Sequence, residues 1–253
     1  MTMKTQTKTG LPRLKIVTAA MGMTIVFGTA AYAQVPYITQ MPITILPNQP
    51  YALCAGAIAW VFDNVAYANC TVLNGNSISL TQSYPYVPAT NQPAGDIQTV
   101  ANQGAMSGTF KVSTYSPPDS VLSGPGKHPS LAIYTCPVRS TGSYAQCDGG
   151  ICFINTSGTT FPGLGPIASN QIVCSCPIRT PSVAYEIMAP ATSQGTCRPN
   201  WESTLCGVGE KPSQRVSNGT TIYIGAPLGG FQYFTTKLLG TSVKLNECKS
   251  GQG

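Results

Sequence analysis

Hydrophobic and polar positions alternate along several short stretches of the chain, which predicts β-strands rather than helices. Residues 110–115 alternate with a period of two, as a strand with one buried face does, and residues 183–187 and 243–245 repeat this pattern. Residues 220–224 and 231–236 are rich in β-branched and aromatic side chains, and the glycine-rich stretch between them is typical of a turn. The sequence after the first 33 residues has no sustained 3.6-residue apolar period. We therefore predict an all-β fold, sandwich-like or small-barrel-like.

The first 33 residues differ from the rest and resemble an export signal in composition. Four basic residues (Lys4, Lys8, Arg13 and Lys15) precede an apolar stretch, residues 16–30, and a small-residue site follows at Ala31-Tyr32-Ala33. This order predicts a signal peptide, residues 1–33, that is cleaved after Ala33. The apolar stretch is shorter than the roughly 20 residues of a membrane span. We expect an exported protein of the periplasm or the extracellular medium, with no stable membrane insertion after cleavage.

Removing the signal changes the charge balance of the chain. Of the 14 basic residues 10 remain, beside 8 acidic residues, so the net charge falls from +6 to about +2. The remaining basic residues are scattered singly, whereas a nucleic-acid-binding protein usually carries a clustered basic face. The composition therefore excludes nucleic acid as the expected partner.

Five sequence blocks occur twice in the same order, which indicates an internal duplication. Residues 51–61 (YALCAGAIAWV) match residues 144–154 (YAQCDGGICFI). The later matches join residues 68–72 with 174–178, 88–92 with 190–194, 108–109 with 219–220, and 130–136 with 242–248. We interpret this order as two diverged copies, residues 51–136 and 144–248, of one disulfide-stapled β module. The corresponding modules are residues 34–140 and 141–253, which could pack as one pseudo-two-fold unit.

All ten cysteines follow the signal, and an even number in an exported chain predicts five disulfides. Cys152 aligns with Ala59 and Cys174 with Ala68, as expected for a bridge between neighbouring strands that only one copy has. Cys197 and Cys206 are absent from the first copy and could clip an inserted loop, which leaves two cysteines to tie the copies together. The expected pairs are Cys54–Cys70, Cys147–Cys176, Cys152–Cys174, Cys197–Cys206 and Cys136–Cys248.

The residues that could carry catalysis or a metal form no recognisable constellation. The single histidine, His128, lies in a loop outside the matched blocks and has no nucleophile motif beside it. Asp148 is the most suggestive of the eight acids because it stands in a glycine-rich turn, but the matching residue of the other copy is Ala55. The spacing of Cys147, Cys152, Cys174 and Cys176 does not match a structural zinc site. We assign no catalytic residue, no metal and no cofactor.

Aromatic residues supply the best indication of binding. Tyr84 and Tyr86 lie in a proline-spaced segment, and Trp201 lies in the loop between Cys197 and Cys206, which we expect to be exposed. Such rings could stack on sugars or fill a pocket of a protein partner. We predict an exported, disulfide-rich, non-enzymatic structural or ligand-binding protein whose partner is a glycan or another exported protein. The alternatives are a secreted, glycan-directed hydrolase with an acid pair, for which Asp148 and Glu202 are candidates, and a cysteine-based metal-binding protein.

Overall fold

The structure is a computed structural model that describes residues 43–80, 111–153, 155–210 and 216–250. Residues 35–253 form one compact unit, and most of the described elements are strands. Residues 1–33, expected to be a signal peptide, and Tyr84 and Tyr86 lie outside the described residues. The chain is therefore a mostly β protein, as the alternation of hydrophobic and polar positions predicts.

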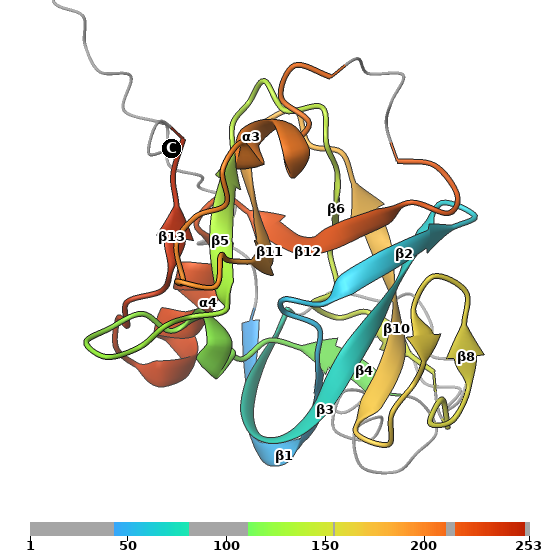
Figure 1. Cartoon of the computed structure of the whole chain (residues 1–253). Helices are drawn as coiled ribbons and strands as arrows, with labels where there is room; N and C mark the ends of the chain where they lie inside the picture. Colours follow the sequence, from blue (N-terminus) through green and yellow to red (C-terminus); the bar gives the residue numbers. More distant parts are fainter. Residues whose placement is uncertain (1–42, 81–110, 154, 211–215, 251–253) are drawn as a thin grey trace, which may run out of the picture. The chain divides into compact units, whose positions relative to one another are not determined.

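In the described part of the chain most strands are short, three have nine or more residues, and three helical segments lie between strands (Figure 1). The strands are β1 (Ile43–Leu53), β2 (Ile58–Phe62), β3 (Val65–Leu80), β4 (Lys111–Thr114), β5 (Leu131–Cys136), β6 (Tyr144–Ala145), β7 (Ile151–Cys152), β8 (Thr160–Phe161), β9 (Gly165–Pro166), β10 (Gln171–Arg179), β11 (Tyr185–Pro190), β12 (Thr221–Pro227) and β13 (Glu247–Cys248). The helices are η1 (Asp119–Val121), α3 (Trp201–Thr204) and α4 (Gly230–Leu239).

The long strands β3 and β10 form an antiparallel pair at the centre of the sheet. Along its other edge β3 pairs with β2 and then with β1, and the other edge of β10 pairs with β7 and then with β6. Strand β12 joins β2 to β6, and β4 joins β1 to β7. The strand pairing therefore closes into two circuits of five strands that share β3 and β10.

Small side chains and cystines fill the main core, which lies on the inner face of these strands. Ala59, Ala66 and Ala68 are completely buried, as are Cys70 and Cys174. Small residues allow strands to approach closely, and disulfides then supply the covalent links that a core with few large side chains needs. A second cluster lies around α4 and a third around α3.

Five disulfides join all ten cysteines, and three of them are the expected pairs: Cys54–Cys70, Cys147–Cys176 and Cys152–Cys174. The other two expected pairs are wrong. Cys136 pairs with Cys206, and Cys197 pairs with Cys248. In the parallel pairing of β13 with β5, Cys248 lies opposite Tyr134, two residues before Cys136. Two residues of strand plus one strand spacing put the Cα atoms of Cys136 and Cys248 about 8 Å apart, too far for a bridge.

The expectation that Trp201 is exposed is also wrong. Its loop is held by Cys197 at one end and by Cys206 at the other, so the tryptophan is pressed onto β5. Only 3% of its surface is accessible, and its ring packs at 5.4 Å from that of Tyr134. Trp201 is therefore a core residue.

Residues 231–236, expected as a strand, belong to helix α4. Phe231, Phe234 and Thr235 recur at helical spacing and are buried on one face, and glycines in the left-handed conformation bound the helix at both ends. Residues 243–245, also expected as a strand, form only an isolated bridge between Leu245 and Leu122. Three buried positions within five residues were too short a pattern to distinguish helix from strand.

Candidate functional site

An exposed row of apolar side chains covers the outer face of β2, β3 and β7. Along β2, Ala59 and Val61 point into the core, so Ile58, Trp60 and Phe62 point outward. The cross-strand register continues this outer face from Trp60 to Tyr67 on β3, to Ser175 on β10 and to Ile151 on β7. We call the following residues the aromatic face: Ile58, Trp60, Phe62, Tyr67, Ile151, Phe153 and Phe161.

The rings of the aromatic face touch one another in two groups. Trp60 and Phe62 stack with ring centroids 5.5 Å apart and planes within 6° of parallel. Phe153 stacks against Tyr67 at 6.0 Å on one side and against Phe161 at 6.1 Å on the other. Phe62 and Phe153 remain 51% and 41% exposed, which is high for large apolar side chains outside an interface.

The β8–β9 hairpin lies against both ring groups. Phe161 at its base contacts Phe153, and Gly163 at its tip contacts Trp60. A Cβ atom at position 163 would lie 2.0 Å from Trp60 Cδ1, so only glycine fits there. Gly163 also has a φ of +75°, which glycine adopts readily. The hairpin therefore forms part of this surface.

The surroundings of the aromatic face are polar and carry little charge, although the exposed acid Asp63 directly follows Phe62. Strands β2, β3, β7, β8 and β9 contain no charged residue, and the only charge of β10 is Arg179 at its end, where Nε donates a hydrogen bond to Gln146. Between the rings lie amide and hydroxyl groups, including the hydrogen-bonded pair Asn69 and Gln171. The surface therefore combines apolar rings with neutral hydrogen-bonding groups.

Among the acids, Glu186 is buried at the N-terminal end of α4. Burial raises the pKa of its carboxyl to about 7, although hydrogen bonds from the backbone N–H groups of Gly229 and Phe231 oppose the shift. No side chain from α4 itself caps this helix, so the carboxyl group from β11 accepts from its free N–H groups instead. This capping role explains why Glu186 is buried, and no catalytic role is needed to explain it.

The two acids considered for hydrolysis lie in different surroundings. Burial raises the pKa of Asp148 to about 7, and this acid is close enough to Tyr115 to affect its pKa. Glu202 forms an ion pair with Arg139 at 2.6 Å and accepts a hydrogen bond from Ser250. His128 is exposed on a loop. Asp148 is therefore a buried acid, whereas Glu202 is engaged by Arg139 and Ser250.

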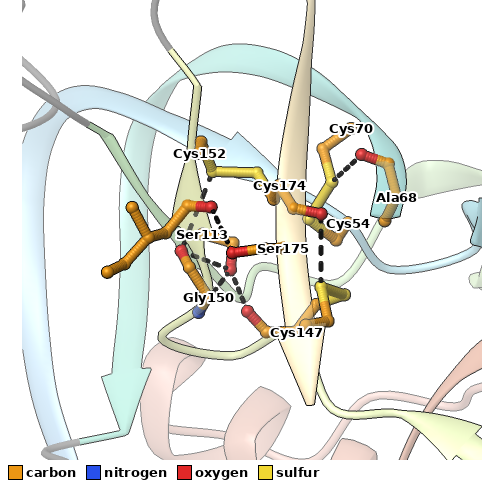
Figure 2. The surroundings of a disulfide bond; sticks show 11 residues. Cys54, Ala68, Cys70, Ser113, Cys147, Gly150, Cys152, Cys174 and Ser175 are labelled. Atoms are coloured by element: carbon orange, nitrogen blue, oxygen red, sulfur yellow. Dashed lines mark hydrogen bonds between the residues drawn. A yellow bond between two sulfur atoms is a disulfide. The ribbon is translucent and has the colours of Figure 1, made fainter. Parts of the chain in front are cut away.

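The cysteines form a dense cluster of sulfur atoms in the core (Figure 2). The Sγ atoms of Cys54, Cys70 and Cys174 lie within 4.8 Å of one another, at a spacing that could suit a metal. Each of these sulfurs is in a disulfide, however, and a metal ligand must be a deprotonated thiolate. Ser113 holds the neighbouring turn by hydrogen bonds with Cys147 and Gly150. The cluster is therefore structural in this oxidised form.

An open, polar pocket of about 500 Å³ lies beside β13. Glu247 and Lys249 on its wall form an ion pair at 2.9 Å, so the two charges largely neutralise each other. The pocket contains no buried polar group directed at a ligand among its lining residues. It is a weaker candidate than the aromatic face.

No protein-family model, no curated protein and no solved structure matches this chain.

Sequence reasoning expected binding at Tyr84, Tyr86 and Trp201 and did not find the aromatic face. A signal was nevertheless present in the matched blocks. Ile58 aligns with Ile151 and Trp60 with Phe153, so both pairs keep their apolar character. Only the strand register shows that they point outward. The sequence shows that these positions are apolar in both blocks, but it does not show that they face away from the core.

Proposed function

We propose that this chain is an exported, non-enzymatic protein that binds a neutral glycan through the aromatic face. The observation that carries the proposal is the run of partly exposed rings on strands that have almost no charge. Flat aromatic rings offer large apolar area to the C–H faces of a sugar. Neighbouring amides and hydroxyls can exchange hydrogen bonds with its hydroxyl groups.

A glycan fits this surface better than a protein partner does. Protein interfaces are enriched in arginine and methionine beside aromatic residues, and their rims are polar and often charged. The aromatic face contains no arginine and no methionine, and its neighbours are mostly asparagine, glutamine, serine and threonine, with Asp63 as an exposed acid beside Phe62. This composition complements an uncharged polymer that is rich in hydroxyl groups.

Export is supported by the cystines and by the sequence of the first 33 residues. Five disulfides are typical of an oxidising compartment and rare in the cytosol. In the described part of the chain, no helix is long and apolar enough to cross a membrane. We therefore infer that the protein acts in the periplasm or the extracellular medium after cleavage behind Ala33.

We further propose that the scaffold consists of two diverged copies, and the strand registers support this. The pair Ala52 and Val72 joins β1 to β3, and the aligned pair, Ala145 and Ile178, joins β6 to β10. Three further pairs of strand partners are aligned in the same way. Ala59–Ala68 corresponds to Cys152–Cys174, and Ala59–Ile222 corresponds to Cys152–Lys111. Ala52–Ser113 corresponds to Ala145–Ile224.

In the central strands, Ala68 lies directly opposite Cys174, which is its aligned counterpart. Two equivalent residues can face each other in an antiparallel pair only at a two-fold axis. The pairing of β3 with β10 is therefore what a pseudo-two-fold axis through Ala68 and Cys174 requires. Each strand circuit would then contain strands of both copies.

A binding assay on polymers tests the proposed function. The purified mature protein is mixed with insoluble cellulose, chitin and starch, and the fraction bound is measured for wild type, Trp60→Ala and Tyr233→Ala. We expect wild type and Tyr233→Ala to bind at least one polymer equally, because Tyr233 lies on α4, away from the face. We expect Trp60→Ala to lose about tenfold in affinity, since stacked rings contribute more than 1 kcal/mol.

Two results would count against the proposal. If no polymer of the panel is retained, a neutral glycan is not the ligand. If Trp60→Ala binds as tightly as wild type, the ligand does not occupy the aromatic face. Release of soluble sugar from any polymer would instead favour the secreted hydrolase.

A further inference from the structure

The aromatic face consists of two similar halves that lie about the Ala68–Cys174 pair. One half contains Ile58 and Trp60 on β2, and the other contains the aligned residues Ile151 on β7 and Phe153, which directly follows β7. Ile58 and Ile151 are 42% and 44% exposed, so the two halves present nearly the same apolar surface. Most cross-strand partners of these residues are also aligned, so the likeness extends through the backbone that holds them.

Each half also carries a second ring beside its first. In one half Phe62, the next outward residue of β2, stacks on Trp60. In the other half the aligned position is Asn155, and Phe161 from the β8–β9 hairpin stacks on Phe153 instead. The same local arrangement, a pair of stacked rings beside an exposed isoleucine, thus arises from different parts of the sequence. A packing requirement of the core does not explain this, because these side chains point away from it.

We propose that the two halves are two subsites for one linear glycan chain, which runs from β2 across β3 and β10 to β7. This inference rests on the proposed function and specifies its ligand as a polymer with at least several sugar units between its two contacts. Strands β2 and β7 are separated by three strand spacings, or roughly 14 Å. A disaccharide cannot reach both subsites, whereas a hexasaccharide can.

The surface between the subsites suits such a chain. Tyr67 lies next to Trp60 in the register and stacks on Phe153, so it links the two ring groups. Asn69 and Gln171 are joined by a 3.2 Å hydrogen bond. Ser175 lies between Tyr67 and Ile151 in the register and donates its hydroxyl to the carbonyl oxygen of Ile151. The Ser175 oxygen can still accept a hydrogen bond from a sugar hydroxyl.

Two linked contacts predict a steep dependence of affinity on chain length. Once one subsite is occupied, the second is filled at a high effective concentration, which can tighten binding by about 10²-fold without any new kind of contact. The experiment is calorimetric titration with the oligosaccharide series of cellulose, chitin and starch, from disaccharide to hexasaccharide. We expect weak, nearly constant affinity for the shortest chains and a rise of about 10²-fold once a chain spans the subsites.

Paired variants distinguish this inference from the proposed function. Trp60→Ala and Phe153→Ala should each abolish the gain with chain length and leave a similar, weak affinity for short chains. The double variant should bind no chain measurably, and Tyr233→Ala should behave as wild type. Circular dichroism and thermal unfolding confirm that each variant is folded.

Three outcomes would overturn the inference. If affinity is independent of length, or if Phe153→Ala matches wild type while Trp60→Ala is impaired, there is one subsite, and glycan binding itself stands. If no oligosaccharide or polymer binds, the proposed function fails as well. If the same two variants dissociate an oligomer and bind no less glycan, the face is an interface between copies of the chain instead.

Discussion

At the scale of single residues, some residues stabilise the fold and others shape the surface. Glu186 belongs to the first kind, because its carboxyl group accepts hydrogen bonds from backbone N–H groups at the start of α4. Burial raises its pKa to about 7, well above the ordinary value of a glutamate. The folded protein therefore binds this proton more tightly than the unfolded chain does.

Glu186 should make the protein less stable as pH rises. Between the ordinary glutamate pKa near 4.5 and the folded value near 7, the folded state holds more protons, so the free energy of unfolding falls with rising pH. A shift of this size corresponds to up to about 3 kcal/mol between pH 5 and pH 8. Glu186→Gln should remove this part of the pH dependence, as measured by urea unfolding at both values.

The exposed Glu210 supplies the control, since Glu210→Gln should unfold like wild type at each pH. Burial also raises the pKa of Asp148, so the free energy of unfolding of Glu186→Gln should still depend on pH to some extent. An unchanged slope in Glu186→Gln would show that this carboxyl is ionised in the folded protein, contrary to the account given above.

Gly163 belongs to the second kind of residue, because it lets the hairpin tip lie on Trp60. Gly163→Ala should push the tip away, since the new Cβ would overlap the indole ring. We expect greater quenching of Trp60 fluorescence by acrylamide, with little change in the free energy of unfolding. Gly165→Ala is the matched control: Gly165 has a φ of +73° but open space around it, so only backbone strain changes.

Equal quenching in the Gly163→Ala and Gly165→Ala variants would contradict the contact between hairpin and indole. A large loss of stability in Gly163→Ala alone would show that the hairpin is part of the core rather than part of the surface.

At the scale of elements, the observed strand pairing agrees with the aligned sequence blocks. The observed helices and strands agree less well with the local hydrophobic patterns. The two blocks that contain Cys152 and Cys174 predicted their bridge, because the small residues aligned with them imply close strands at that place. Helix α4 was missed because its buried positions, Phe231, Phe234 and Thr235, also suit a short strand. The pairs Cys136–Cys206 and Cys197–Cys248 depend on the parallel register of β5 and β13, which no local sequence signal specifies.

The aligned pairs allow a direct test of the proposed duplication. Ala59 and Ala68 lie opposite each other between β2 and β3, as Cys152 and Cys174 do between β7 and β10. The double variant Ala59→Cys/Ala68→Cys should therefore form a sixth disulfide, seen as a linked peptide in non-reduced mass spectrometry. The single variants should each contain one free thiol and keep the five native bridges.

Two free thiols in a folded double variant would mean that the two places differ in geometry despite their common register. The proposed equivalence of the copies would then have to be restricted to the backbone pairing.

At the scale of the whole molecule, cystines supply much of the stability that a core of small residues cannot. Each bridge contributes about 2–4 kcal/mol, largely by restricting the unfolded chain, and the gain increases with the loop that it closes. The bridges close loops of very different size, from 16 residues for Cys54–Cys70 to 70 for Cys136–Cys206. All four of these cysteines are buried, so the loss of packing should be similar.

Removing the longer link should therefore cost more. We expect the Cys136→Ala/Cys206→Ala variant to lose about 1 kcal/mol more than Cys54→Ala/Cys70→Ala, as measured by denaturant unfolding. The reverse order would indicate that the sulfur cluster around Cys54 contributes chiefly through packing rather than through chain entropy. In both variants the other four bridges should remain intact by mass spectrometry.

The central claim is that a glycan occupies the aromatic face, and tryptophan fluorescence tests it most directly. The chain has two tryptophans, and Trp201 is only 3% exposed, so quenching by acrylamide reports on Trp60. We predict that a saturating polymer from the binding panel protects Trp60 from the quencher. If polymer is bound but acrylamide quenches Trp60 as strongly as it does without polymer, the glycan does not occupy the aromatic face.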